Sequence, residues 1–113
     1  MSSYTLKVEF LDRLEHITKN IEDRVSLNTD QYNRVVRIGF DIIDLYIEKG
    51  HSTKEFPNME KYIYYILFFL GFEYKKYISI DNEADIAISK LFTMASTFGL
   101  LIGKNKIHYV SKL

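Results

Sequence analysis

The chain has 113 residues, 47% of them apolar, which is enough for one domain with a single hydrophobic core. Its 15 basic and 15 acidic residues cancel, which argues against a protein that binds polyanions over its whole surface. The absence of cysteine excludes disulfides and thiolate metal sites and fits a reducing, cytoplasmic location. The most apolar stretch, residues 62–72, is too short to span a bilayer, so we expect one soluble domain, residues 1–113.

The first half of the chain, residues 1–50, is predicted to form two amphipathic helices. The first begins near Ser3, and its apolar stripe, at spacings of three and four, is Leu6, Phe10, Leu14, Ile17 and Ile21. Thr29 or Asp30 is the expected N-cap of the second helix, Gln31–Lys49. One face of this helix is either an acidic patch for a partner or an ordinary solvated surface, and its carboxylates are Asp41, Asp44 and Glu48.

The second half, residues 57–113, begins with a helix over Asn58–Leu70 that is apolar on almost every side apart from Lys61. Such a helix belongs in the middle of a core or in an interface. Its aromatic residues form either core packing or a platform for a partner. Tyr77–Ile80 then favours extended backbone and predicts a short strand.

A fourth helix is expected over Glu83–Thr97, with a buried stripe of Ala84, Ala87, Ile88, Leu91, Ala95 and Phe98. Its outer face is predicted to carry Asp85, Ser89, Lys90, Thr93 and Ser96. The chain then ends in a hairpin: an apolar strand at Leu100–Ile102, a turn at Gly103–Asn105 and a return strand at Lys106–Val110. The predicted fold class is therefore mainly α with a small C-terminal β-hairpin (α+β).

No pattern in the sequence predicts catalysis. His16, His51 and His108 lie in different elements, and none has a neighbour at metal-ligand spacing. Glycine-rich phosphate loops and Gly-x-Ser-x-Gly elbows are both absent from the sequence. We therefore expect a protein that is not an enzyme and that uses no metal and no cofactor.

Residues 87–113, AISKLFTMASTFGLLIGKNKIHYVSKL, resemble the end of a winged helix-turn-helix domain. In both, a helix ends at a Phe-Gly-Leu step, and an apolar strand, a basic wing tip and a return strand follow. The resemblance implies a winged-helix-like fold of four helices plus a two- or three-stranded wing sheet, with Tyr77–Ile80 as the third strand. The TubR-type partition proteins of plasmids and phages are similar in size and also lack an enzymatic site.

The resemblance implies that the partner is double-stranded DNA, bound by a homodimer that regulates transcription or partitions plasmid or phage DNA. The wing would contribute Lys104, Asn105, Lys106 and His108. The helix over Glu83–Thr97 would be the recognition helix, reading DNA through Ser89, Lys90 and Thr93, and it would be flanked by Lys75 and Lys76.

The charge at the start of that helix supports a different hypothesis. Asp81, Glu83 and Asp85 would repel phosphates if they faced DNA. The alternative is a protein-binding inhibitor, such as an immunity protein, an antitoxin or a phage-encoded antagonist. It would bind a partner protein through an acidic or aromatic helical face. Salt-dependent binding to duplex DNA would favour the first hypothesis, and co-purification with a basic partner protein would favour the second.

Overall fold

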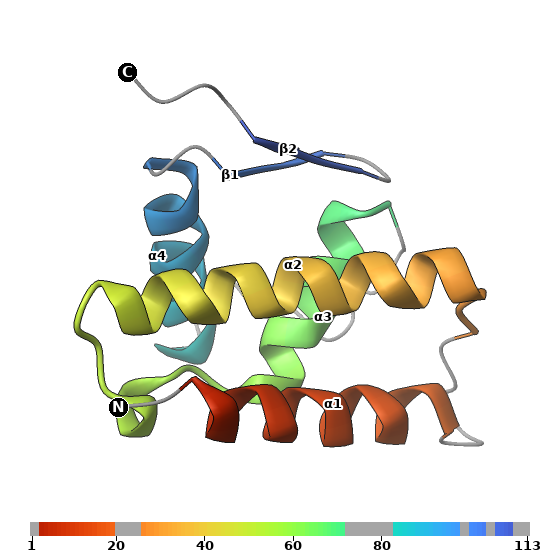
Figure 1. Cartoon of the computed structure of the whole chain (residues 1–113), viewed down its shortest axis with the longest axis horizontal. Coiled ribbons are helices and arrows are strands. Elements are labelled where there is room, and N and C mark those ends of the chain that lie inside the picture. Colours follow the sequence, from red (N-terminus) through yellow and green to blue (C-terminus); the bar gives the residue numbers. More distant parts are fainter. Residues whose placement is uncertain (1–2, 20–25, 72–82, 98–99, 104–105, 110–113) are drawn as a thin grey trace.

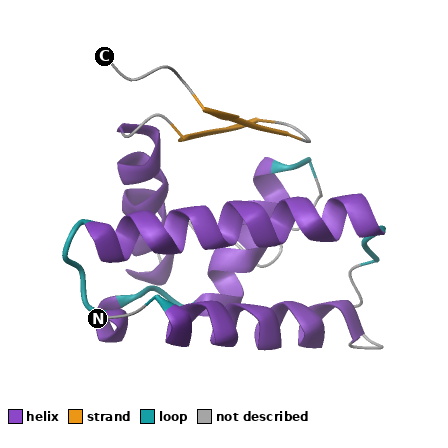
Figure 2. Ribbon diagram, viewed as in Figure 1, coloured by secondary structure: helices purple, strands orange, loops and turns teal. Residues whose placement is uncertain are grey.

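The computed structural model describes residues 3–19, 26–71, 83–97, 100–103 and 106–109 (Figure 1). Helices account for most of these residues, and the two strands have four residues each (Figure 2). The elements in chain order are α1 (Tyr4–Lys19), α2 (Thr29–Glu48), the 3-10 turn η1 (Thr53–Glu55), α3 (Met59–Phe69), α4 (Glu83–Thr97), β1 (Leu100–Gly103) and β2 (Lys106–Tyr109).

The N-cap of α2 is Asn28, so the prediction of Thr29 or Asp30 is wrong. The Asn28 side chain accepts a hydrogen bond from the backbone N–H of Gln31 at 2.8 Å. The Gln31 side chain in turn accepts one from the backbone N–H of Asn28 at 2.9 Å. All three residues suit an N-cap, but only Asn28 is followed three positions later by a Gln that completes this capping box.

Helices α1 and α2 run antiparallel and approach closely at Gly39. Lys7, near the start of α1, forms an ion pair of 2.7 Å with Asp44, in the second half of α2. The fully buried ring of Phe10 occupies the space where a side chain on Gly39 would lie, because a Cβ there would be 2.3 Å from Phe10 Cζ. Gly39 is therefore needed because α1 packs closely against α2 at this position, and not because the chain turns there.

Helix α3 crosses behind α2 in the view of Figure 1 and places Tyr62 at the centre of the core. The Tyr62 hydroxyl donates a hydrogen bond of 2.8 Å to the Gly39 carbonyl. Its ring packs edge-on against Phe10 of α1, with ring centroids 5.8 Å apart, and lies 6.1 Å from the Phe92 ring of α4. Complete burial holds the pKa of the Tyr62 phenol well above its ordinary value, with the charge of Asp41 as a smaller cause, so the hydroxyl stays a donor.

Helices α3 and α4 lie side by side and point in the same direction. Near their first turns, Lys61 Nζ lies 3.2 Å from Asp85 Oδ1. Further along, the rings of Phe69 and Phe92 lie 5.0 Å apart. The two helices are therefore a parallel pair, and the residues between them in the sequence, 72–82, lie outside the described residues.

Strands β1 and β2 pair antiparallel, in a register that runs from Leu100 opposite Tyr109 to Gly103 opposite Lys106. The hairpin lies over the C-terminal end of α4 and along α2 in Figure 1, with β1 against α4 and β2 against α2. Within the described residues the sheet has these two strands alone. The expected third strand, Tyr77–Ile80, lies outside the described residues.

The winged-helix-like α+β class predicted from the sequence is wrong. A helix-turn-helix joins its two helices by a short turn at a steep angle, whereas α3 and α4 are a parallel pair whose N-terminal ends meet. The buried apolar core described here comes from the four helices and the Leu70 cap of α3. The resemblance rested on the local pattern of residues 87–113, but the class depends on how α3 and α4 are connected and oriented.

Gly39→Ala tests the close approach of α1 and α2. Replacing Gly by Ala inside a helix normally stabilises it by roughly 1 kcal/mol. Here the methyl group would press on the buried Phe10 ring, and overpacking of a core costs roughly 1–3 kcal/mol. We expect a net loss of up to about 2 kcal/mol in the free energy of unfolding, measured by urea denaturation.

The Phe10→Leu background is the control, because a smaller side chain at position 10 leaves room for the methyl group. Gly39→Ala should cost less in that background than in the wild type. An equal cost in both backgrounds, or a stabilised Gly39→Ala protein, would contradict the packing that we describe at this crossing.

Candidate functional site: a groove between α3 and α4

The outer side of the α3–α4 contact is hollowed. Lys61, Tyr65 and Phe69 follow one another along one face of α3 at spacings of four. Two adjoining hollows, of about 420 and 320 Å³, share Tyr65, Ser89 and Thr93 in their walls. We call the two together the α3–α4 groove, and its described lining is Tyr65, Phe69, Asp85, Ile86, Ser89, Lys90, Phe92, Thr93 and Ser96.

One end of the groove is closed by a buried ion pair. Asp85 is only 2% exposed, so its predicted place on the outer face of the helix is wrong. Lys61 Nζ donates to both carboxylate oxygens of Asp85, at 3.2 and 3.3 Å. A buried carboxylate needs such a partner, since an unpaired charge in the interior is very costly. The pair therefore removes the Asp85 charge from the outer face of α4.

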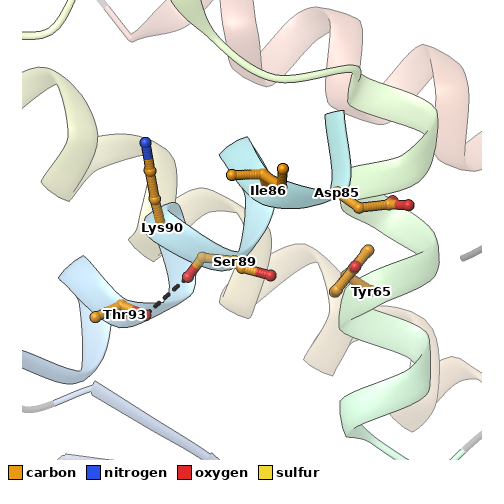
Figure 3. Close-up of a pocket in the computed structure, with 6 residues that line it drawn as sticks. All are labelled: Tyr65, Asp85, Ile86, Ser89, Lys90 and Thr93. Carbon is orange, nitrogen blue, oxygen red and sulfur yellow. Dashed lines mark hydrogen bonds between the residues drawn. The ribbon is translucent and has the colours of Figure 1, made fainter. Parts of the chain in front are cut away.

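Tyr65 extends this polar cluster along the groove. Its phenol lies near the Asp85 carboxylate and the Ser89 hydroxyl, and both of them influence its pKa. Burial is the largest cause that raises the pKa of Tyr65 above its ordinary value, and the charge of Asp85 raises it further. The Ser89 hydroxyl acts in the opposite direction. Figure 3 shows Tyr65 of α3 beside Ser89 and Asp85 of α4, while Lys90 points away from α3.

The threonine hydroxyls on this side of α4 are satisfied within the helix. Thr93 Oγ1 donates to the Ser89 carbonyl at 2.9 Å, the dashed line of Figure 3, and Thr97 Oγ1 donates to the Thr93 carbonyl at 3.0 Å. These bonds use the hydroxyl protons. The groove is therefore less polar than its run of Ser and Thr residues suggests.

The groove exposes apolar surface instead. Phe69 is 37% exposed and Ile86 is 49% exposed, although both are large apolar side chains. Phe92 supports the wall, because its ring lies 5.0 Å from Phe69 and 6.2 Å from Tyr65. Lys90 places an exposed ammonium group at the rim. This arrangement suits an apolar or amphipathic ligand with a negative charge near Lys90.

The structure brings together three of the residues predicted to contact DNA. Ser89, Lys90 and Thr93 are exposed on α4 and line the same hollow. Lys106 and His108 belong to β2, opposite Gly103 and Leu101. The remaining predicted contacts lie outside the described residues, and they are Lys75, Lys76, Lys104 and Asn105.

The residues on α3 that face α4 were not predicted from the sequence. The sequence leaves open an aromatic platform for a partner on this helix, but it does not single out Tyr65 and Phe69 as the face toward α4. One signal was available, because Lys61 is a lone cation in that helix, and a cation there needs a counter-charge when the helix is buried. The spacing of four from Lys61 to Tyr65 to Phe69 then marks the face that meets the partner helix.

The acidic residues of α2 form no isolated patch. Asp44 is bound by Lys7 at 2.7 Å and by the Ser3 hydroxyl at 2.9 Å, so part of the predicted acidic face holds α1 and α2 together. Within the described ranges, no three His, Cys, Asp or Glu residues are grouped closely enough to hold a metal ion. The described helices also include none with the length and hydropathy needed to cross a membrane. No family model, curated protein or solved structure matches the chain.

Lys61→Met tests the buried ion pair, because it keeps the apolar stem and leaves Asp85 without its ammonium partner. We expect the free energy of unfolding to fall by roughly 3 kcal/mol, measured by urea denaturation. Asp85→Asn should cost less, because the Lys61 side chain is 23% exposed and its ammonium group can turn toward water.

The double variant Lys61→Met/Asp85→Asn completes a cycle, and it should be more stable than Lys61→Met alone. Lys54→Met is the matched control, since Lys54 is an exposed lysine of η1, and its effect should stay within about 0.5 kcal/mol. Additive costs in the cycle would show that Lys61 and Asp85 do not stabilise each other.

Proposed function

We propose that this protein acts by binding another protein, with an amphipathic helix of the partner lying in the α3–α4 groove. One observation carries the proposal: large apolar side chains are exposed along a groove in which Asp85 is paired with Lys61 and the Thr93 hydroxyl bonds within its own helix. An exposed apolar groove of this kind is a common binding site for a helix, which inserts side chains spaced three and four residues apart.

The two walls of the groove differ in a way that suits a helix. The α3 wall is aromatic, with Tyr65 and Phe69. The α4 wall presents small side chains at Ser89, Thr93 and Ser96, which allow another backbone to approach closely. Apolar anchors of the partner would pack against the rings, and a carboxylate of the partner would pair with Lys90. Such an activity is that of an adaptor or an inhibitor, and it requires no chemical step.

Selection from a displayed library of short helical peptides tests the proposal. Peptides enriched on the wild-type protein should carry apolar residues at a helical spacing. Ile86→Glu should abolish their binding, because it puts a charge on the exposed apolar wall without disturbing the core. Binding is measured by fluorescence anisotropy of the labelled peptides.

Asn33→Glu is the matched control, because it adds the same charge to an exposed position on α2, away from the groove. It should leave peptide binding unchanged. Phe69→Ala serves as a second groove variant that adds no charge and should weaken binding. If no peptide is enriched, or if the enriched peptides bind both groove variants as well as the wild type, the proposal fails.

A second candidate is binding to duplex DNA, and the pairing of Asp85 with Lys61 favours it. That pairing buries one of the three carboxylates at the start of the α4 segment, which leaves less negative charge to repel phosphates. Lys90 on α4 and the lysines of the hairpin segment would then contact the DNA backbone. In this candidate the protein would regulate transcription or take part in DNA partition.

A salt titration of binding to random duplex DNA tests this second candidate. Affinity should fall steeply as salt rises, because each neutralised phosphate releases counterions. The variant Lys104→Ala/Lys106→Ala should bind more weakly, and its salt slope should be shallower by about one for each phosphate that it no longer neutralises. Lys54→Ala, in η1, is the control. Absence of binding at low salt would remove this candidate and leave the first untouched.

A further inference from the structure

The exposed large apolar side chains of the described residues fall into two separate sets. Phe69 and Ile86 belong to the α3–α4 groove. The other set lies on α1, where Tyr4 is 72% exposed and Val8 and Leu11 are 41% and 36% exposed. We call these three residues the α1 stripe. Helix α1 packs on α2 and α3, whereas α4 packs on α2, α3 and β1, so the two sets lie on different parts of the molecule.

The α1 stripe is a ridge on the side of the helix that faces away from the core. Its spacings of four and three place its members on one face, while Leu6, Phe10 and Leu14 are buried on the other side. Carboxylates flank the stripe at Asp12 and Glu15, and Glu15 is held by Lys19 at 2.6 Å. Because Lys19 neutralises Glu15, the α1 face is an amphipathic helix surface with apolar anchors and one carboxylate, Asp12, beside them.

These features match what the groove requires of its ligand. At roughly 1.5 Å per helical residue, the stripe from Tyr4 to Leu11 is about 10 Å long. The groove wall from Ile86 to Ser96 is about 15 Å long, so the stripe is short enough to fit along it. The stripe offers aromatic and branched side chains to an aromatic wall. The Asp12 carboxylate beside it would meet the ammonium group of Lys90 at the rim.

We propose that the α1 stripe of one copy docks in the α3–α4 groove of a second copy. This inference rests on the proposed function, because it names the helix that the groove binds when no other partner is present. The contact is heterologous, since each copy uses a different surface, so copies add head to tail unless a ring closes. One stripe in one groove is a small interface, and such interfaces are weak and transient.

Sedimentation velocity over a range of protein concentrations tests the proposal with two variants. Val8→Glu places a charge in the stripe and leaves the groove intact. Ile86→Glu places a charge in the groove and leaves the stripe intact. The wild type should sediment faster as its concentration rises, and each variant alone should remain a monomer at the same concentrations. An equimolar mixture of the two should form a 1:1 dimer and nothing larger, because one intact stripe and one intact groove remain.

Asn33→Glu should associate as the wild type does, which controls for added charge. Val8→Ser and Ile86→Ser repeat the pair without a charge, and circular dichroism verifies that each variant is folded. The proposal is overturned if the wild type stays monomeric at every concentration, if either variant still associates, or if the mixture forms no dimer. Library peptides that bind the groove of a monomeric wild type would overturn the self-contact alone and leave the proposed function standing.

Discussion

The hydrogen bond from Tyr62 to the Gly39 carbonyl fixes the arrangement on which the groove depends. The Tyr62 side chain meets α2 through this bond and α1 and α4 through ring contacts with Phe10 and Phe92. The phenol is fully buried, so an unpaired hydroxyl there would cost the desolvation of a polar group. Because Tyr62 points into the core, the neighbouring row of Lys61, Tyr65 and Phe69 must lie to one side of α3, which is the side that α4 covers. The core contact therefore sets the rotation of α3, and that rotation sets the wall of the groove.

The polar cluster beside that wall decides what the groove can bind. An unpaired carboxylate at Asp85 would make this end of α4 acidic, but Lys61 neutralises it. The Thr93 hydroxyl donates to the Ser89 carbonyl of its own helix. A helix that recognises DNA needs donors and acceptors that point outward, whereas this groove also exposes the large apolar side chains of Phe69 and Ile86. The same residues that look like a recognition helix in the sequence thus support an apolar contact better than base readout.

The sequence contains the helices but not their mutual orientation. The periodic stripes predicted four helices near their observed bounds, and they identified buried residues such as Phe10 and Ile88. Periodicity assigns a residue to a face of its own helix and carries no information on which helix covers that face. Asp85 shows the difference. A charged residue is expected on the outer face of a helix, yet Asp85 is buried, because Lys61, 24 positions earlier, pairs with it. That contact depends on the parallel packing of α3 and α4, which local patterns do not encode, and the winged-helix class failed for the same reason. The sequence left open an aromatic platform for a partner, but local patterns cannot locate the groove, since its two walls come from different helices.

A stripe and a groove on one chain have a consequence for binding. Exposed apolar sets of this kind promote association, and a folded protein that retains them commonly uses them as an interface. If both the α1 stripe and a partner helix fit the α3–α4 groove, they compete for it, and each self-contact fills the groove of one copy with a weak ligand. A partner helix then needs a higher affinity for the groove than that weak contact has. Dilution frees the groove of the α1 stripe, and a bound partner displaces the stripe from it. The same competition favours a partner that resembles α1, with apolar anchors at spacings of four and three and a carboxylate beside them. If the groove binds a helix, the exposed face of α1 therefore specifies the kind of helix that fits it.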